Sequence, residues 1–395
     1  MKTKYLFYAL GCIMSFGQIK AADLYVRDLG AGGAYSTISA AITAANNGDR
    51  IIIKPKIGNV PYLENLTINK SLTFVSETNF SKYNVQGNIT IVPAAGRVIN
   101  LHNMYAFQSS ISTTATTFTG GRCTINIVNC TADSSFDFST SKNVTANVYG
   151  STANALYFLH GKVVGNFIET IRLNNDSAPL ATSDVYIIAN KTAGIGSSTT
   201  NYPINILNND VSNAGFSYGP VDLAEIKAGS TNIVQNNRIL TTSVAGTYSA
   251  LRIYGSNTGI INISNNIINA AGSNATEISA TVYPTVIASY NLATSTFSAT
   301  GVDIQNNNIS SATYDLDLNL LISSGAIINA GVPDEEYQDL DLTRSDIGPL
   351  GGSNSWANYW PSNAGNKPRV TFLNTPRRVY LGTTSIQAEA TGISK

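Results

Sequence analysis

The sequence INILNNDV at residues 204–211 recurs along the chain and decides how the chain folds. Close copies occupy residues 232–239 (NIVQNNRI), 261–268 (INISNNII) and 302–309 (VDIQNNNI), and weaker copies occupy residues 125–132 and 185–192. The third position of each copy is Ile or Val, and the sixth is Asn except at Cys130. In the central copies this Asn recurs about every 28 residues, which is the length of one coil of a solenoid.

Each copy alternates apolar and polar residues with a period of two, which predicts a strand rather than a helix. One such strand cannot bury its apolar face alone. Coils stacked ~4.8 Å apart would bury a continuous column of Ile and Val. We therefore predict an all-β fold, a single parallel β-helix over residues 24–352.

The Asn at the sixth position of each copy predicts a ladder of stacked amides. It lies two residues before an apolar residue, so it should point inward, where stacked amides can satisfy one another. Asn also tolerates the left-handed backbone of such turns. Cys130, in the same column, is expected to be a buried thiol and not a nucleophile. The long gap before the last copy predicts an inserted loop or an extra coil within residues 273–300. The predicted ladder consists of Asn190, Asn209, Asn237, Asn266 and Asn307.

The two ends of the predicted solenoid carry motifs of their own. Residues 35–45 (YSTISAAITAA) predict an amphipathic helix placed to cover the N-terminal end. Together with residues 46–75, this stretch resembles the opening of right-handed parallel β-helix proteins of the pectate-lyase-like superfamily. Residues 326–331 (AIINAG) and 339–348 (DLDLTRSDIG) resemble the closing motif of secreted bacterial members. The resemblance implies a right-handed coil, but this fold serves lyases, hydrolases, adhesins and spacers and so implies no single activity.

Residues 1–17 predict a secretory signal peptide, with Lys2 and Lys4 before an apolar stretch at residues 5–16. We expect cleavage ahead of Gln18 and a secreted or outer cell-surface protein. A second interpretation is a lipoprotein anchored at Cys12, although Ala9 stands where Leu is usual. Removal of the signal leaves two cysteines, too few for a disulfide framework.

Composition excludes several classes of protein. The chain has 395 residues, with 24 Lys+Arg against 24 Asp+Glu, and charged residues make up only 12%. A balanced, charge-poor surface offers no footprint for nucleic acid. Beyond the signal no apolar run is long enough to span a membrane. With 2 His and 3 Cys in the chain, we expect no metal centre built from these residues.

One group of side chains is a candidate ligand-binding patch. Asp222 to Lys227 and Leu251 to Tyr254 occupy equivalent places in consecutive coils. Stacking would pair Glu225 with Arg252 and Lys227 with Tyr254 on the outer surface, which could hold a glycan. The alternative, which we favour, is ordinary ion pairing on a solvated face. Neither Lys227 nor Arg252 has an obvious device that would make it a base, so we expect binding rather than turnover there.

The densest acidic run consists of Asp334, Glu335, Glu336, Asp339, Asp341 and Asp346. A Ca²⁺ site is one interpretation of it, but the spacing does not match an EF-hand loop. A closing loop in which Arg344 bridges Asp341 or Asp346 is simpler, and we predict no metal or other cofactor. His102 and His160 are expected to be packed or surface residues rather than general bases.

Residues 353–395 are predicted to form an aromatic loop and a short β tail. The tail could be a docked hairpin, a linker or the start of a further module. For the whole chain we favour a non-enzymatic adhesin, glycan-binding or structural element. The alternative is a polysaccharide lyase or glycoside hydrolase, for which an acidic glycan is one candidate substrate. A polysaccharide or surface glycan is the expected partner in either case.

Overall fold

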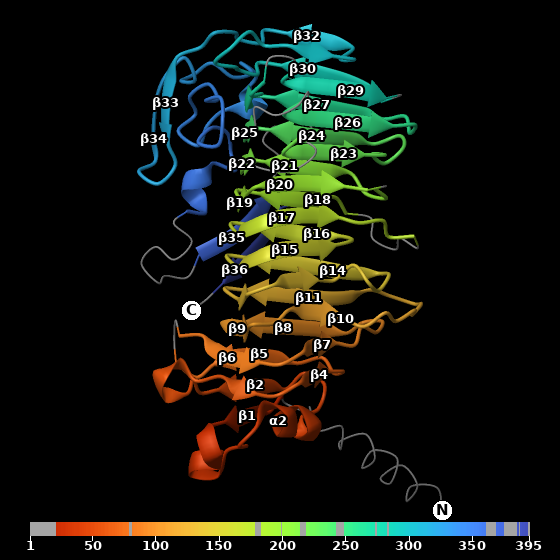
Figure 1. Cartoon of the computed structure of the whole chain (residues 1–395), viewed down its shortest axis with the longest axis vertical. Coiled ribbons are helices and arrows are strands. Elements are labelled where there is room, and N and C mark those ends of the chain that lie inside the picture. Colours follow the sequence, from red (N-terminus) through yellow and green to blue (C-terminus); the bar gives the residue numbers. More distant parts are fainter. Residues whose placement is uncertain are drawn as a thin grey trace, which may run out of the picture.

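The computed structural model describes residues 21–78, 81–177, 183–198, 200–213, 219–241, 249–272, 275–282, 284–360, 369–374, 385–386 and 388–393. Nearly all strands lie in two large parallel sheets of 13 and 19 strands that stack along one long axis (Figure 1). Within these two sheets each strand pairs in parallel with the equivalent strand of an adjacent coil. The predicted all-β, parallel β-helix architecture is therefore confirmed.

The 13-stranded sheet forms the first face of the solenoid. Its pairing is in register from coil to coil; Ile187, for example, lies between Val163 and Ile206. In spatial order its strands are β1 (Asp23–Val26), β2 (Arg50–Ile53), β5 (Thr73–Ser76), β8 (Val98–His102), β11 (Cys123–Val128), β14 (Val144–Tyr149), β16 (Gly161–Val164), β18 (Val185–Ile188), β21 (Ile204–Leu207), β24 (Thr231–Gln235), β27 (Ile260–Ser264), β30 (Thr285–Ser289) and β32 (Ile304–Asn306).

The 19-stranded sheet bends into a second and a third face. The long strands β15 (Thr152–Phe158) and β17 (Phe167–Leu173) run through both faces. The second face also holds β3 (Tyr62–Leu63), β6 (Tyr83–Gln86), β9 (Met104–Phe107), β12 (Thr131–Ala132), β19 (Lys191–Thr192), β22 (Asp210–Asn213), β25 (Arg238–Thr241) and β28 (Ile267–Asn269). The third also holds β4 (Leu66–Ile68), β7 (Ile89–Ile91), β10 (Ile111–Thr113), β13 (Ser135–Asp137), β20 (Gly194–Ser197), β23 (Val221–Ala224), β26 (Leu251–Gly255), β29 (Ile278–Val282) and β31 (Ala299–Thr300).

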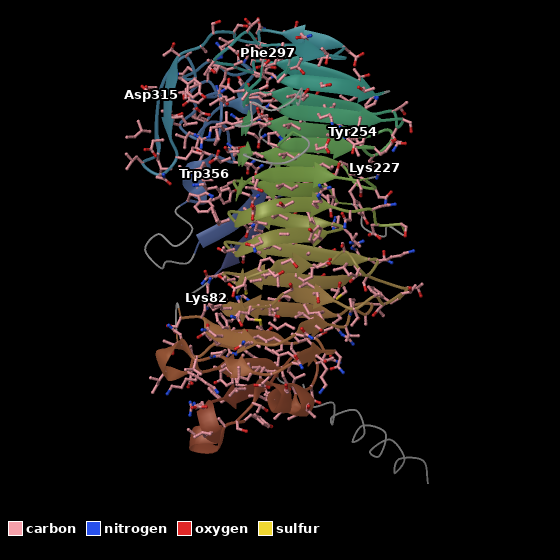
Figure 2. All side chains as sticks on the ribbon, viewed as in Figure 1. Lys82, Lys227, Tyr254, Phe297, Asp315 and Trp356 are labelled. Atoms are coloured by element: carbon pink, nitrogen blue, oxygen red, sulfur yellow. The ribbon has the colours of Figure 1, made fainter. Side chains whose placement is uncertain are left out.

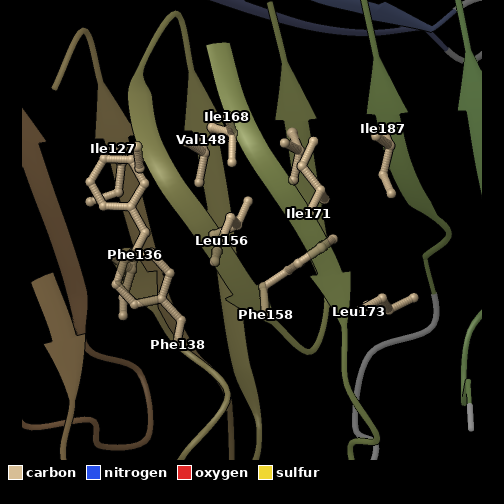
Figure 3. Packing of buried hydrophobic residues seen from close by; sticks show 14 of the residues in the cluster. Ile127, Phe136, Phe138, Val148, Leu156, Phe158, Ile168, Ile171, Leu173 and Ile187 are labelled. Carbon is tan, nitrogen blue, oxygen red and sulfur yellow. The ribbon is translucent and has the colours of Figure 1, made fainter. Parts of the chain in front are cut away.

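Columns of identical or similar apolar residues fill the interior. One column contains Ile127, Val148 and Ile187 from the first face, and a facing column contains Phe136, Leu156 and Ile171 (Figure 3). All six side chains are buried. Burial of each contributes about 1.5–3 kcal/mol, so the core and not disulfides holds this fold.

The predicted N-terminal helix is present as α2 (Ile38–Ala44), and Ile38, Ala41 and Ile42 face the core. Both of its ends are satisfied by side chains from the first coil. Glu64 accepts hydrogen bonds from the backbone N–H groups of Ile38 and Ser39, both at 2.8 Å. The Lys70 ammonium donates to three carbonyls at the C-terminal end, those of Ile42, Thr43 and Ala45. These opposite charges complement the helix dipole.

The C-terminal boundary of the predicted β-helix is wrong. The last coil ends at Ile309, which bridges to Leu292. Residues 310–360, here the return segment, contain the antiparallel pair β33 (Tyr314–Asp317) and β34 (Ile322–Gly325) and the turns η3 (Glu335–Tyr337) and η4 (Trp356–Asn358). They run back beside the stack (Figure 1). Coil formation stops because Gln305 pairs with the buried Ala288, so an apolar column meets a polar residue.

The return segment covers an apolar strip on the outside of the solenoid. Trp356 and Trp360 stack with 5.0 Å between ring centroids, and the Trp360 indole donates to the carbonyl of Ala189 at 2.6 Å. The strip beneath consists of Val128, Tyr149, Val164, Ile188 and Ala189. Of the three interpretations of the tail, the structure shows a docked hairpin, β35 (Arg369–Asn374) with β36 (Glu389–Ile393). Phe372 is buried against Tyr186, and Glu389 pairs with Lys162.

Candidate functional site

A buried Asn ladder lies at the turn between the first and second faces. The Asn190 side-chain amide donates to Asn209 Oδ1 at 2.9 Å, and Asn209 donates to Asn237 at 3.0 Å. Asn237 donates in turn to Asn266 at 2.9 Å. The structure thus places four of the five predicted Asn residues in one buried ladder. The ladder continues through Asn291 and Asn308, and Asn166 precedes it.

The prediction for Asn307 is wrong. Asn307 is exposed and has a left-handed φ of 54°, while Asn308 accepts the ladder bond from Asn291 at 3.1 Å. Residues 306–308 are all Asn, so the sequence alone left the register open by one residue. Pairing of Gln305 with Ala288 sets that register. The long gap before the last copy contains an extra coil, which supplies Asn291.

The residue before each ladder position takes the left-handed conformation, as Asn208, Asn236 and Asn265 do. The left-handed backbone of the turn therefore lies at the fifth position of each copy and not, as predicted, at the sixth. These three side chains point away from the interior of the solenoid and form hydrogen bonds with the return segment. Asn208 donates to the carbonyl of Pro349 at 2.9 Å, Asn236 donates to that of Asp346 at 2.8 Å, and Asn265 accepts from the N–H of Val332 at 2.8 Å.

Cys130 takes the ladder position in its coil, as expected. Its thiol lies 3.3 Å from the carbonyl of Leu101 and 3.4 Å from that of Val128. Burial raises the pKa of this thiol to about 11, so it is protonated at neutral pH and unsuited to attack a substrate.

The acidic run forms a loop closed by main-chain contacts. Asp339 accepts hydrogen bonds from the N–H groups of Asp346 and Gly352, and burial raises its pKa to about 6. The predicted bridge from Arg344 to Asp341 or Asp346 is wrong: Arg344 donates to the carbonyl of Gly331 at 2.6 Å. Within the described residues no group of three or more His, Cys, Asp or Glu is placed to hold a metal.

The predicted ligand patch is only partly assembled. Arg252 and Tyr254 share the outer surface of β26, with the guanidinium 4.5 Å from the ring centroid. Arg252, however, forms a two-pronged ion pair with Asp222, at 2.7 and 2.9 Å, and not with Glu225. The register places Asp222 opposite Arg252 and Ala224 opposite Tyr254, so both predicted cross-coil pairings are wrong.

Glu225 and Lys227 leave the strand before they could join the patch. β23 ends at Ala224, and Glu225 has a left-handed φ of 42°, which breaks the alternation that the prediction assumed. The Glu225 carboxylate accepts from the N–H groups of Ser256 and Asn257 and so holds a turn of the next coil. Lys227 lies in the turn that follows. Figure 2 labels Lys227 and Tyr254 at the right-hand edge of the solenoid, away from Trp356.

A groove on the second face has more of the features of a binding site than the predicted ligand patch has. This groove was not predicted from the sequence. It has a volume of about 350 Å³ and crosses β15, β17, β19 and β22. Phe167 is its aromatic side chain and is 51% exposed, and the Lys191 ammonium lies 6.0 Å from the centre of that ring. Glu169, two residues along β17, also lines the groove.

The floor of the groove is electrostatically balanced. Asp210 is buried and forms a two-pronged ion pair with Arg238, at 2.7 and 2.8 Å. Its charge is therefore already matched within the protein. Thr152 and Ser212 line the same groove with hydroxyl groups. The groove thus combines an aromatic surface, an exposed ammonium, an exposed carboxylate and neutral hydroxyls within one concave site.

The strand pattern could have suggested this groove. In β17 the inward positions are Ile168, Ile171 and Leu173, so Phe167 occupies an outward position that would ordinarily be polar. The copies of the repeat, on which the prediction concentrated, begin on the first face and do not cover this strand.

The two histidines are packed residues, as predicted. His160 is buried, within hydrogen-bonding distance of Thr145 and Ser183 at 3.1 Å each, and its ring lies against Tyr202. Burial, followed by the charge of Arg122, lowers the His160 pKa to about 4. Burial also lowers the pKa of His102.

Comparisons with known proteins assign this chain to no family, so its function has to be inferred from the geometry of the site. A scan against protein-family models and searches of curated proteins and of solved structures found no match to this chain. Among the described residues, no helix has the length and apolar character needed to cross a membrane.

Proposed function

We propose that this chain is a secreted or cell-surface bacterial protein that binds a glycan in the second-face groove without converting it. We also propose that it is a right-handed β-helix of the pectate-lyase-like superfamily, on the strength of its opening and closing motifs. The signal-like residues 1–17 support export. The single observation that carries the binding role is the half-exposed Phe167 ring in a groove that Glu169 and Lys191 also line.

The side chains of the groove suit a sugar ring. Sugars present one apolar face of C–H groups, which packs on an aromatic ring, and a rim of hydroxyls. Glu169 can accept hydrogen bonds from such hydroxyls, and Lys191 can donate to them or pair with an acidic substituent. Stacked coils repeat at ~4.8 Å, close to the length of one sugar residue, so a chain of sugars could cross several coils.

Asp210 and His160 favour binding over catalytic turnover, because both side chains are already engaged in contacts within the protein. The Asp210 carboxylate is committed to Arg238, so it is poorly placed to act as a general base. His160, the more buried of the two histidines, holds its own hydrogen bonds away from the groove lining. These features support a binding site that orients a glycan.

A glycan array, followed by an assay for unsaturated products from uronate polymers, tests this proposal. We expect the wild type to bind a defined set of glycans and Phe167→Ala to lose that set. Tyr254→Ala, which removes an exposed aromatic from another face, is the matched control and should bind as the wild type does. Release of products that absorb in the ultraviolet would instead establish the lyase alternative, and an empty array would remove the binding role.

A further inference from the structure

We propose that the glycan lies along the axis of the solenoid as an extended, linear chain, and that Tyr105 forms a second stacking subsite for it. This inference rests on the proposed function, because it extends the groove at Phe167. Tyr105 lies on β9 and Phe167 on β17, and both strands belong to the second face.

One column of outward-facing residues joins the two aromatic side chains. Tyr105 pairs with Thr131 in the next coil. Thr152 pairs with Thr131 on one side and with Phe167 on the other. Three coil steps of ~4.8 Å therefore separate Tyr105 from Phe167, a distance of about 14 Å. Because one sugar residue is about as long as one step, an extended glycan of about four residues would reach both rings.

The surface between the two rings suits the hydroxyl rim of a sugar chain. Thr152 is exposed and Thr131 is half-buried, so hydroxyl groups lie along the column between the aromatic side chains. The Lys82 ammonium donates to the Thr131 hydroxyl and adds a cation to the same stretch. Asn154, also exposed, lines the groove beside Thr152. Hydroxyl, amide and ammonium groups all form hydrogen bonds with sugar hydroxyls.

Contacts within the protein hold Tyr105 in position. Its hydroxyl donates at 2.8 Å to the carboxylate of Asp133, which follows β12 in the next coil toward Phe167. The Tyr105 side chain therefore reaches from β9 toward the groove. Phe107 packs edge-on against it, with 5.7 Å between ring centroids. An aromatic ring that is already held in place loses little conformational freedom when a sugar stacks on it.

The opposite end of the column is closed, so the glycan can extend only toward Tyr105. Beyond Phe167 the column continues through Lys191 to Asp210. Arg238 follows, and its guanidinium is paired with Asp210. The next residue, Ile267, is buried in a cluster with side chains of the return segment. In Figure 1 the return-segment strands β33 and β34 lie beside the upper coils, and β9 lies well below them.

Oligosaccharides of defined length test the proposal. The probes are cello-, xylo-, manno-, chito- and galacturono-oligosaccharides of about two to six residues, first on an array and then, for each series that binds, in solution by titration calorimetry. The proteins are the full-length wild type, Phe167→Ala, Tyr105→Leu and Tyr105→Phe. Leu removes the flat ring of Tyr105 but keeps an apolar side chain, and Phe keeps the ring and loses only the hydroxyl.

The wild-type affinity is expected to rise with length up to four or five residues and then to level off. Tyr105→Leu should bind these longer oligosaccharides about tenfold more weakly and the disaccharide as tightly as the wild type does. Tyr105→Phe should match the wild type at every length, whereas Phe167→Ala should bind weakly at every length.

Two results would overturn the second subsite and leave the groove at Phe167 as the glycan site. One is a wild-type affinity that does not depend on length. The other is a Tyr105→Leu protein that binds every length as the wild type does, or that loses affinity equally at every length. Absence of wild-type binding to the whole array, or unchanged binding by Phe167→Ala, would instead overturn the proposed function and this inference with it.

Discussion

The side-chain amide of Asn237 donates to Asn266 Oδ1 at 2.9 Å and to the carbonyl of Ile206 at 2.9 Å, so that one side chain joins three successive coils. Its backbone N–H also donates to the same Oδ1 at 2.9 Å. The ladder thus satisfies buried polar groups at a turn that the apolar core cannot stabilise.

Replacing Asn237 with Leu should lower the free energy of unfolding by about 1–3 kcal/mol, because the carbonyl of Ile206 loses a donor and the backbone N–H of Asn209 loses its acceptor. Asn306→Leu is the matched control, since Asn306 is exposed on the last strand of the first face. Chemical denaturation of both variants measures the difference. Equal stability of Asn237→Leu and the wild type would mean that the ladder contributes nothing net.

Replacing Lys70 with Met should lower the free energy of unfolding by about 1 kcal/mol, because three carbonyls at the end of α2 lose their donor. Lys142→Met, at an exposed position, controls for the loss of one charge. Thermal melts of the two variants report the difference. A melt of Lys70→Met that matches that of Lys142→Met would count against the capping role.

Stability should fall in mild acid because of His160. Its pKa in the folded protein is lowered from 6.5 to about 4, so the unfolded chain takes up the proton first as pH falls. The stability is fully present above pH 6.5 and falls by about 1.4 kcal/mol per pH unit toward pH 4.

His160→Asn, which cannot titrate, should flatten this pH dependence in urea titrations at several pH values. Asp339 acts with the opposite sign, since its raised pKa of about 6 costs stability as pH rises through that value. The difference between wild type and His160→Asn isolates the histidine. An identical pH profile for both proteins would contradict the assignment.

Removing the Trp360 side chain should loosen the tail from the solenoid. Trp360→Ala loses the stack on Trp356 and the hydrogen bond to Ala189. We expect faster cleavage by trypsin after Arg369 and no change in cleavage of the solenoid coils. Tyr254→Ala, on another face, serves as the control. Cleavage at the wild-type rate would show that the aromatic contact does not hold the tail.

The repeat predicted the coils and most of the ladder because one physical requirement recurs in each coil. Ile206, Val234 and Ile263 fill one column, and the Asn residues after them meet one turn geometry. Three features depend on where a strand stops, which local alternation does not specify. They are the shift to Asn308, the departure of Glu225 from its strand and the end of the coils at Ile309. The groove at Phe167 depends on β17, a strand that no copy of the repeat includes.

Isothermal titration of a glycan selected on the array, into wild type and Phe167→Ala, tests the central claim most directly. The account predicts that loss of the ring weakens binding about tenfold, equivalent to about 1.4 kcal/mol, while Tyr254→Ala binds as tightly as wild type. An unchanged dissociation constant for Phe167→Ala would contradict the assignment of the groove as the glycan site.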